Sequence, residues 1–308
     1  MSINHDQLLE VKHLAVRFHM YQQKFTQHNL EAISDLSLTV RKGEILAVVG
    51  SSGSGKSLLA HAILGILPAN AQVLGRMSYE GRPLTPDYQK ELRGDKIAFV
   101  PQSISYLDPL MQVGKQVQGT HYSPERQEKI FRRYGLNEKV SRLFPFQLSG
   151  GMARRVLIST AVISAAELII ADEPTPGLNP EIAEETMKNF RELADQGCAV
   201  LLITHDLDLA LAYADQVAVF YAGTTVEISP AQDFIQGEKF LRHPYSKALW
   251  RALPQNGFQA MDGFQPYSGQ QPTGCLFANR CPDRSNECSG TIPLKQIRGG
   301  EVRCVHAS

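Results

Sequence analysis

Long apolar stretches are missing from this sequence of 308 residues. No run approaches the roughly 18 apolar residues that a membrane-spanning helix needs, so we expect no such helix. The opening residues, Met-Ser-Ile-Asn-His-Asp, lack the basic and apolar segments of a signal peptide, which favours a cytosolic protein. An excess of positive charge is also missing, because Lys+Arg and Asp+Glu both number 31. This balance argues against a nucleic-acid-binding surface.

A glycine-rich loop follows the apolar run 45–49. Its pattern, G-x-x-x-x-G-K-S, is typical of a phosphate-binding loop between a strand and a helix. Glycines let successive backbone N–H groups turn toward an anion, and the helix adds its positive N-terminal end. Lys56 can reach the outer phosphates and Ser57 can hold Mg²⁺. The alternative is a turn without a ligand. The predicted phosphate-binding residues are Gly50, Ser51, Ser52, Gly53, Ser54, Gly55, Lys56 and Ser57.

Two carboxylates end a second apolar run, 168–171. Acidic residues at the carboxyl end of a parallel strand lie where such sheets bind ligands. Asp172 is placed to bind Mg²⁺ through water, and Glu173 is placed to orient or deprotonate an attacking water. The alternative is a strand that simply ends in solvated acids. The phosphate loop earlier in the chain makes the functional interpretation the better one.

The segment Leu-Ser-Gly-Gly-Met, residues 148–152, is a second candidate for a helix N-terminus that binds an anion. It precedes an amphipathic stretch that is suited to a helix. Ser149 can cap this helix, which is the structural interpretation. The functional interpretation is that Ser149, Gly150 and Gly151 meet a γ-phosphate. Since the chain already has a phosphate loop, that nucleotide would be held by another subunit.

The motifs follow one another in an order that resembles the ATP-binding cassette (ABC) ATPases over about residues 8–235. The resemblance implies a head-to-tail dimer with two ATP molecules between the subunits. Each ATP would be held by one chain's phosphate loop and the other chain's Leu-Ser-Gly-Gly segment. The motifs are the phosphate loop, Gln102, Leu-Ser-Gly-Gly-Met, Leu-Ile-Ile-Ala-Asp-Glu-Pro-Thr and Thr204-His205-Asp206.

The resemblance also implies roles for single residues. Gln102, in Phe-Val-Pro-Gln, is similar to the glutamine that senses Mg²⁺ and water. His205 is similar to the switch histidine that touches the γ-phosphate, although a lone histidine here would more often be structural. Phe18 fits the aromatic residue that stacks on the adenine base. Tyr21 and Phe25 lie nearby, and all three aromatics can instead be packing residues.

The sequence departs from the family pattern in two places. Asn179 stands where many relatives have aspartate, which keeps a polar side chain but loses the charge. The structural interpretation is that Asn179 caps a helix beginning at Pro180. The exchange puts in doubt how this loop supports the partner's site. After the signature, Ala153-Arg154-Arg155 replaces the frequent Arg-Gln-Arg, and we expect little consequence from that change.

Alternating patterns at the start of the chain predict antiparallel strands. Strands expected at 45–49, 97–100, 168–171, 199–204 and 217–221 then alternate with helices at 56–67, 152–165 and 181–195. This order predicts an α/β fold of the P-loop NTPase, ABC ATPase type, with a mostly parallel sheet core, an antiparallel β subdomain and a helical subdomain at about 103–165. We expect a cassette at 1–235 and a small cysteine-rich extension at 236–308.

The extension resembles that of one ABC importer branch, which takes up dipeptides, oligopeptides, nickel or metallophores. The segments that carry this resemblance are His243-Pro244-Tyr245-Ser246-Lys247-Ala248-Leu249 and Gly274-Cys275-Leu276-Phe277-Ala278-Asn279-Arg280-Cys281-Pro282. A stretch rich in Gln, Gly, Pro and Ser, 254–273, separates them and predicts a loop-rich link.

Four of the five cysteines lie in the last 34 residues, at Cys275, Cys281, Cys288 and Cys304. Structural disulfides are rare in the cytosol, so this cluster indicates a metal site. Structural zinc usually uses closer cysteine pairs, whereas four thiolates suit an iron–sulfur cluster. Resemblance to peptide importer ATPases favours [4Fe–4S] as well. Zn²⁺ and free thiols remain the alternatives, and Cys198 is interpreted as a packing residue.

These features predict the ATP-hydrolysing motor subunit of an ABC importer, on the cytoplasmic face of the membrane. Its cofactors would be ATP, Mg²⁺ and the cluster. The partners implied are a second, different ATPase subunit, two permeases and an extracytoplasmic solute-binding protein. In this family the helical region and the loop after Gln102 dock a permease. The rival interpretations are a soluble ABC ATPase acting on ribosomes or DNA, and an iron–sulfur electron-transfer ATPase. The cargo is left open.

Overall fold

The computed structural model describes residues 6–21, 27–266 and 273–307 of the chain. They form two compact units. The first unit comprises the described residues of 1–41, 46–89 and 204–308, and the second comprises 42–45 and 90–203.

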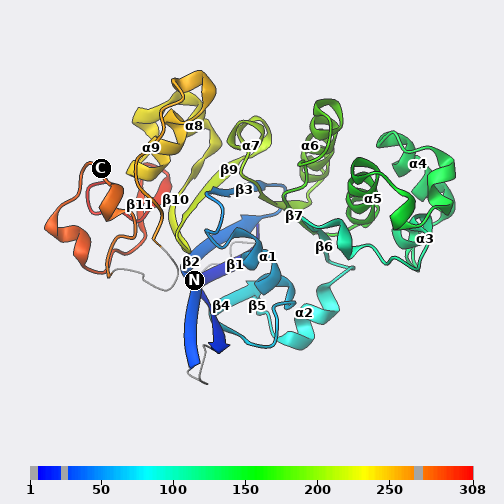
Figure 1. Cartoon of the computed structure of the whole chain (residues 1–308), viewed down its shortest axis with the longest axis horizontal. Coiled ribbons are helices and arrows are strands. Elements are labelled where there is room, and N and C mark those ends of the chain that lie inside the picture. The colour runs from blue at the N-terminus through cyan, green and yellow to red at the C-terminus, as the bar shows by residue number, and fades with distance from the viewer. Residues whose placement is uncertain (1–5, 22–26, 267–272, 308) are drawn as a thin grey trace. The chain divides into compact units, whose positions relative to one another are not determined.

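The first unit is built on a sheet with the strand order β5-β4-β1-β2-β10-β9-β3. The long strands β1 and β2 pair antiparallel, as do β1 and β4, whereas β3 and β9 are parallel (Figure 1). The alternating apolar residues of the opening stretch, such as Leu14, Val16 and Leu36, are fully buried, which confirms the antiparallel prediction. The strands are β1 (Gln7–Tyr21), β2 (Gln27–Arg41), β3 (Ile45–Gly50), β4 (Ala71–Tyr79), β5 (Arg82–Pro83), β9 (Gln216–Tyr221) and β10 (Thr224–Pro230).

Short helices complete the first unit. The first of them ends three residues before the predicted residue 67, because Gly65 adopts a left-handed conformation and the Gln89 amide donates to the carbonyls of Ala62 and Ile63. The helices are α1 (Lys56–Leu64), α7 (Leu207–Tyr213), α8 (Ala231–Gln236) and α9 (Pro244–Arg251), with 3₁₀ turns at Glu238–Phe240, Pro254–Asn256, Ala278–Arg280 and Asn286–Ser289. Helix α2 (Pro86–Leu92) spans the end of this unit and the start of the next.

The second unit contains three parallel strands, β6 (Ile97–Val100), β7 (Leu168–Asp172) and β8 (Ala199–Ile203), in the order β8-β7-β6. Strands β7 and β8 are buried along their whole length, as expected for a parallel sheet covered on both faces. The helices are α3 (Val113–Gln118), α4 (Pro124–Arg133), α5 (Gly150–Val162) and α6 (Pro180–Asp195), with 3₁₀ turns at Ile104–Tyr106, Glu138–Arg142 and Pro145–Gln147.

The helical region of the second unit has an apolar core of its own. Val113, Phe131 and Val156 are fully buried in it, and they come from α3, α4 and α5. This core holds together the segment that the sequence assigns to a helical subdomain. Each predicted strand and helix of the cassette is present within a few residues, so the predicted ABC ATPase architecture is confirmed at the level of its elements.

The C-terminal extension is attached through the sheet of the first unit. Strand β12 (Gly300–Val302) pairs antiparallel with both β11 (Lys295–Ile297) and β10. The pairing places Val302 opposite Glu227 and Glu301 opposite Ile228. The last strands of the extension therefore extend a cassette sheet. The boundary at residue 235 stays a prediction.

A buried ion pair ties the extension to β10. Glu227 is fully buried, and its carboxylate accepts hydrogen bonds from the backbone N–H groups of Arg242 and His243, at 3.1 and 2.7 Å. The Arg242 guanidinium lies 3.3 Å from Glu227 and 2.8 Å from Asp233. It also donates to the carbonyl oxygens of Ile297 and Arg298. These partners offset the desolvation of both charges.

Glu227→Gln should lower the free energy of unfolding by roughly 2–4 kcal/mol, because it leaves the buried Arg242 with less compensating charge. Urea unfolding followed by Trp250 fluorescence measures the effect, since this single tryptophan of the chain lies in α9. Glu301→Gln, on the neighbouring strand β12, is the matched control. Equal unfolding midpoints for the two variants would contradict this role of Glu227.

Candidate functional site

The phosphate loop leaves β3 through glycines that other residues cannot replace. Gly50 has a φ of 154°, and a Cβ there would lie 2.2 Å from the carbonyl oxygen of Phe220. Gly53 and Gly55 have φ values of 77° and 92°, in the left-handed region. A Cβ on Gly55 would lie 2.8 Å from Cγ1 of Ile33. The loop conformation therefore depends on its glycines.

The start of α1 is suited to an anion. Gly55 occupies the N-cap and no side chain caps the helix, so the positive end of α1 is not neutralised by a capping oxygen. Lys56 is 8% exposed, and its Nζ donates to the carbonyl oxygens of Gly50 and Ser51 at 2.8 and 3.0 Å. Ser54 is fully buried, and its hydroxyl lacks a hydrogen-bond partner among the described residues. These features fit a bound phosphate chain.

Two other predicted residues lie in the first unit. His205 is exposed and directly precedes Asp206, which caps α7 by accepting a hydrogen bond from the N–H of Leu209 at 2.9 Å. Phe18 is half-buried on β1, opposite Leu30 of β2. The Tyr21 side chain and Phe25 lie outside the described residues.

The two predicted carboxylates of the second unit are buried at the carboxyl end of β7. Asp172 is 2% exposed and Glu173 is 7% exposed. Glu173 has a φ of 48°, a left-handed conformation that is uncommon for a residue with a side chain. Its backbone N–H donates to the carbonyl oxygen of Ile203 at 2.8 Å. Such strain persists only where surrounding structure holds it, and it is common at functional sites.

Arg154 is one element that holds this turn. This buried residue of α5 donates to the carbonyl oxygen of Pro101 at 2.6 Å and to the carbonyl oxygen of Glu173. Burial lowers the pKa of the guanidinium, and the charges of Asp172 and Glu173 oppose that shift. The Arg154 side chain thus links the backbone of Pro101, which precedes Gln102, to the backbone of Glu173. Sequence reasoning expected little from this position, because a local pattern does not show partners 53 and 19 residues away.

The other candidate residues of the second unit are exposed, except Gly151, which is half-buried. Gln102 follows the buried Pro101 and begins an exposed loop. Ser149 accepts a hydrogen bond from the N–H of Met152 at 3.3 Å, and Asn179 accepts one from the N–H of Ile182 at 3.1 Å. Both residues therefore cap helices, α5 and α6, as the structural interpretations predicted. Gly150, also exposed, lies in the first turn of α5.

The candidate residues are divided between the two units. The first unit holds the phosphate loop, Phe18 and His205, and the second holds Gln102, the signature residues 149–151, Asp172, Glu173 and Asn179. Within each unit the local geometry suits the predicted chemistry. The role of each residue toward a nucleotide or Mg²⁺ stays a prediction.

The four C-terminal cysteines lie in one small region. Burial raises the pKa of Cys275 and Cys304, and raises that of Cys281 to about 11. A smaller rise in the pKa of Cys275 comes from the charges of Cys288 and Cys304, and in that of Cys281 from Cys275 and Cys304. Among the described residues, however, no three or more His, Cys, Asp or Glu side chains are grouped so that they could hold a metal ion. The arrangement gives no support to the predicted metal site.

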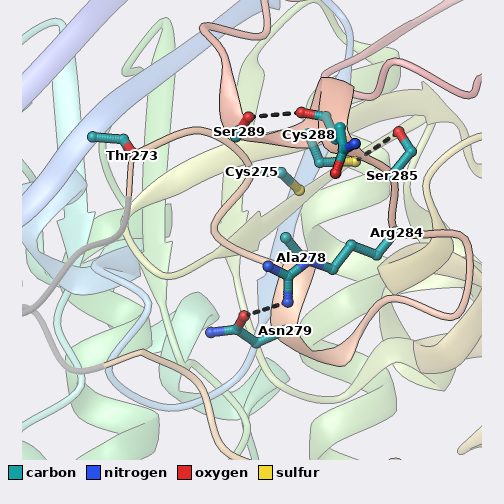
Figure 2. Close-up of a pocket in the computed structure, with 9 residues that line it drawn as sticks. Thr273, Cys275, Ala278, Asn279, Arg284, Ser285, Cys288 and Ser289 are labelled. Atoms are coloured by element: carbon teal, nitrogen blue, oxygen red, sulfur yellow. Dashed lines mark hydrogen bonds between the residues drawn. The ribbon is translucent and has the colours of Figure 1, made fainter.

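Two of these cysteines line a cavity of about 270 Å³ (Figure 2). Cys275 and Cys288 are joined by a backbone hydrogen bond of 2.8 Å, from the N–H of Cys275 to the carbonyl oxygen of Cys288. Arg284 donates to the side chain of Asn279 at 3.1 Å on the opposite part of the lining. The Cys288 sulfur lies 3.7 Å from Nε2 of His306.

Comparison with protein families finds two matches. A model of the ABC transporter family matches residues 33–176. A model of the C-terminal region of oligopeptide/dipeptide transporters matches residues 226–288. No described helix combines the length and the apolar character that crossing a bilayer requires.

Curated relatives match nearly the whole chain. The oligopeptide transport ATP-binding protein OppD of Escherichia coli K12 is 33% identical over 319 residues, covering 97% of this chain and 92% of that protein. The dipeptide transport ATP-binding protein DppD of the same organism is 34% identical, covering 97% and 96%. DppD of Haemophilus influenzae is 34% identical, covering 96% and 94%.

Solved structures share the fold. The dimeric ATP-binding cassette MJ0796 bound to ADP and phosphate has a TM-score of 0.65 at 24% identity, and covers 73% of this chain and 99% of that one. An ATP-binding subunit of an ABC transporter has a TM-score of 0.62 at 26% identity, covering 74% and 92%. These likenesses confirm the predicted ABC ATPase fold.

Glu173→Gln should keep ATP binding and lose most turnover, by about 10²–10⁴-fold, because a carboxamide cannot act as a base toward water. Lys56→Ala should instead weaken ATP binding, because it removes the charge at the phosphate loop. Phosphate release by the assembled transporter and the ATP dissociation constant separate the two effects. Glu181→Gln, exposed in the first turn of α6, is the control. Hydrolysis by Glu173→Gln at the control's rate would remove Glu173 from this role.

Proposed function

Since this chain belongs to the ATP-binding subunits of ABC transporters, in the branch with the oligopeptide and dipeptide C-terminal region, we propose that it drives the import of peptides by hydrolysing ATP. The observation that carries the proposal is the intact phosphate loop with its uncapped helix α1, in a chain that matches peptide transport ATP-binding proteins over 97% of its length. The named relatives give no support to nickel as the cargo.

The proposed chemistry uses residues of both units. The backbone of residues 50–57 and the Lys56 ammonium bind the phosphates. Ser57, Gln102 and Asp172 would hold Mg²⁺, which when bound neutralises charge on the phosphates. Glu173 orients a water and accepts its proton as the water oxygen attacks the γ-phosphorus. The bond between that phosphorus and the β,γ-bridging oxygen breaks, and ADP and phosphate leave. His205 contacts the γ-phosphate, and Phe18 stacks on the base.

A second cassette completes each site in this proposal. Ser149, Gly150 and Gly151 start a helix, and Ser149 and Gly150 are exposed, so they are accessible to a nucleotide held by another subunit. Asn179, which has no charge, supports the partner's site through its loop. We infer a different, similar cassette as the partner because of this exchange, with a homodimer as the alternative outcome.

An exposed apolar surface supports contact with a permease. The loop after Gln102 carries Ile104, Tyr106, Leu110 and Met111, which are 47, 52, 87 and 41% exposed. Apolar side chains gathered on one loop are typical of a protein interface. We propose that one of the transporter's two membrane subunits docks here, which puts the chain on the cytoplasmic face of the membrane. An extracytoplasmic binding protein delivers the peptide, and nucleic acid has no part.

Leu110→Asp should prevent binding of the chain to the permeases, because it puts a charge on the most exposed apolar side chain of this loop. In a pull-down with the tagged full chain, mass spectrometry should find two permeases and a second cassette with the unaltered chain, and should lose the permeases with the variant. Ile235→Asp, exposed to 60% on α8, is the control. Permeases retained by Leu110→Asp would contradict the docking surface, and two copies of this chain alone would contradict the heterodimer.

For the extension we propose the [4Fe–4S] cluster on the pattern of the four cysteines, with zinc as the alternative metal. Its role is structural, in a small segment with little core of its own. Binding would require the thiols to move closer than they lie in the described structure.

Protein purified without oxygen should be brown and contain about four iron atoms per chain, as such a cluster requires. Cys281→Ser should lose the colour and the iron while ATP binding at the phosphate loop is kept. Cys198→Ser, outside the extension, is the control and should stay brown. A colourless preparation that contains stoichiometric zinc, or no metal, refutes the iron–sulfur proposal.

A further inference from the structure

The C-terminal extension contacts the phosphate loop at Ser51. The Ser51 hydroxyl donates a hydrogen bond to the side-chain oxygen of Gln265, which lies 214 residues later in the chain. Hydrogen bonding with the side chain and the backbone of the same serine lowers the pKa of the Tyr245 phenol, although burial raises it by more. Two residues of the extension thus meet one residue of the loop, and all three belong to the first unit.

Tyr245 is held rigidly in this position. It is 4% exposed, and its ring lies 4.5 Å from the ring of Tyr221 and 5.4 Å from that of Phe277, between centroids. Burial raises the pKa of its phenol, so the hydroxyl keeps its proton and remains a donor at neutral pH. A buried tyrosine hydroxyl needs a polar partner, and Ser51 supplies it.

The residue two positions earlier fixes the backbone of Tyr245. His243 caps α9, and its Nδ1 accepts a hydrogen bond from the N–H of Tyr245 at 3.0 Å. Burial lowers the pKa of His243 to about 3, so the imidazole is neutral and can accept. The His-Pro-Tyr segment therefore has a physical role here, since the histidine starts the helix and the tyrosine reaches the loop.

The segment that contains Gln265 is anchored in turn. Arg280 donates to the carbonyl oxygens of Asp262 and Met261, at 2.9 and 3.3 Å, and to the hydroxyl of Tyr221 at 3.4 Å. Tyr221 ends β9, the strand that pairs with β3. The segment that contains Gln265 and the strand that leads into the phosphate loop are therefore both attached to β9.

Ser51 also contacts the lysine of the loop. Its carbonyl oxygen accepts a hydrogen bond from Nζ of Lys56 at 3.0 Å. The position of the Ser51 backbone therefore sets where the ammonium lies before the phosphates arrive.

We propose that Tyr245 and Gln265 are positioning residues for ATP: through Ser51, the C-terminal extension holds the phosphate loop in the conformation that receives the phosphates. The inference rests on the proposed function in taking this loop as the ATP site. Binding is favoured because the loop is already ordered when the nucleotide arrives.

The test measures the dissociation constant for ATP, with Mg²⁺, in the full chain by calorimetry. Tyr245→Phe keeps the ring and removes the hydroxyl, and it should raise the constant by about 3–10-fold, as loss of one hydrogen bond does. Gln265→Ala should do the same. The matched controls are Tyr122→Phe, in the helical region, and Gln259→Ala, exposed in the extension, and both should bind like the unaltered chain.

A double-mutant cycle separates positioning from loss of packing. In the Ser51→Ala background, Tyr245→Phe should have a smaller effect on ATP binding than in the unaltered chain, since its interaction with the Ser51 hydroxyl is already lost. An unchanged constant in both single variants overturns the proposal. An equal loss with and without Ser51 also overturns it, because the effect would then be structural. Failure of the proposed function looks different: the unaltered chain and Lys56→Ala would bind ATP equally poorly.

Discussion

A phosphate loop must turn its backbone toward a ligand without help from side chains, and this constraint shapes the first unit. The chain leaves β3 at Gly50, where the carbonyl oxygen of Phe220 occupies the space that a Cβ would need. Helix α1 then begins without a capping side chain, so its positive end remains available. The parallel pairing of β3 with β9 fixes where this turn occurs. Strands β3 and β9 thus hold that turn in place.

In the second unit, buried charged side chains surround a strained turn. Two carboxylates are buried at the end of β7, and Glu173 adopts a left-handed backbone that is unfavourable for it. The buried Arg154 offers opposite charge and binds the carbonyl oxygens of Pro101 and Glu173. A glutamine at this position would supply hydrogen bonds without the charge. The sequence predicted little consequence from having Arg154 in place of glutamine. Arg154 nevertheless binds the backbone of Glu173, the residue proposed to act on water.

Much of this organisation can be predicted from local sequence. The apolar runs that end in the loop and in Asp172 are strands, and the helix starts at Ser149 and Asn179 are capped as their side chains allow. The long-range partners could not be predicted. Ser51 and Gln265 are 214 residues apart, and neither lies in a pattern with a period that would bring them together. The cysteine spacing indicated a metal site, yet among the described residues no three His, Cys, Asp or Glu side chains are grouped so that they could hold a metal ion. The spacing of cysteines along the chain does not determine how close their side chains lie when few helices or strands separate them.

The extension is more than an appendage on a complete cassette, because its contacts reach the cassette by two routes. Strand β12 extends the sheet at β10, beside the buried pair of Glu227 and Arg242. Tyr245 reaches the phosphate loop from α9, which begins immediately after that arginine and its neighbour His243. A change in the extension that moved Arg242 would therefore move the start of α9 as well. The same short segment, 242–245, carries both the stability of the extension and its contact with the nucleotide loop, so the two properties are physically coupled.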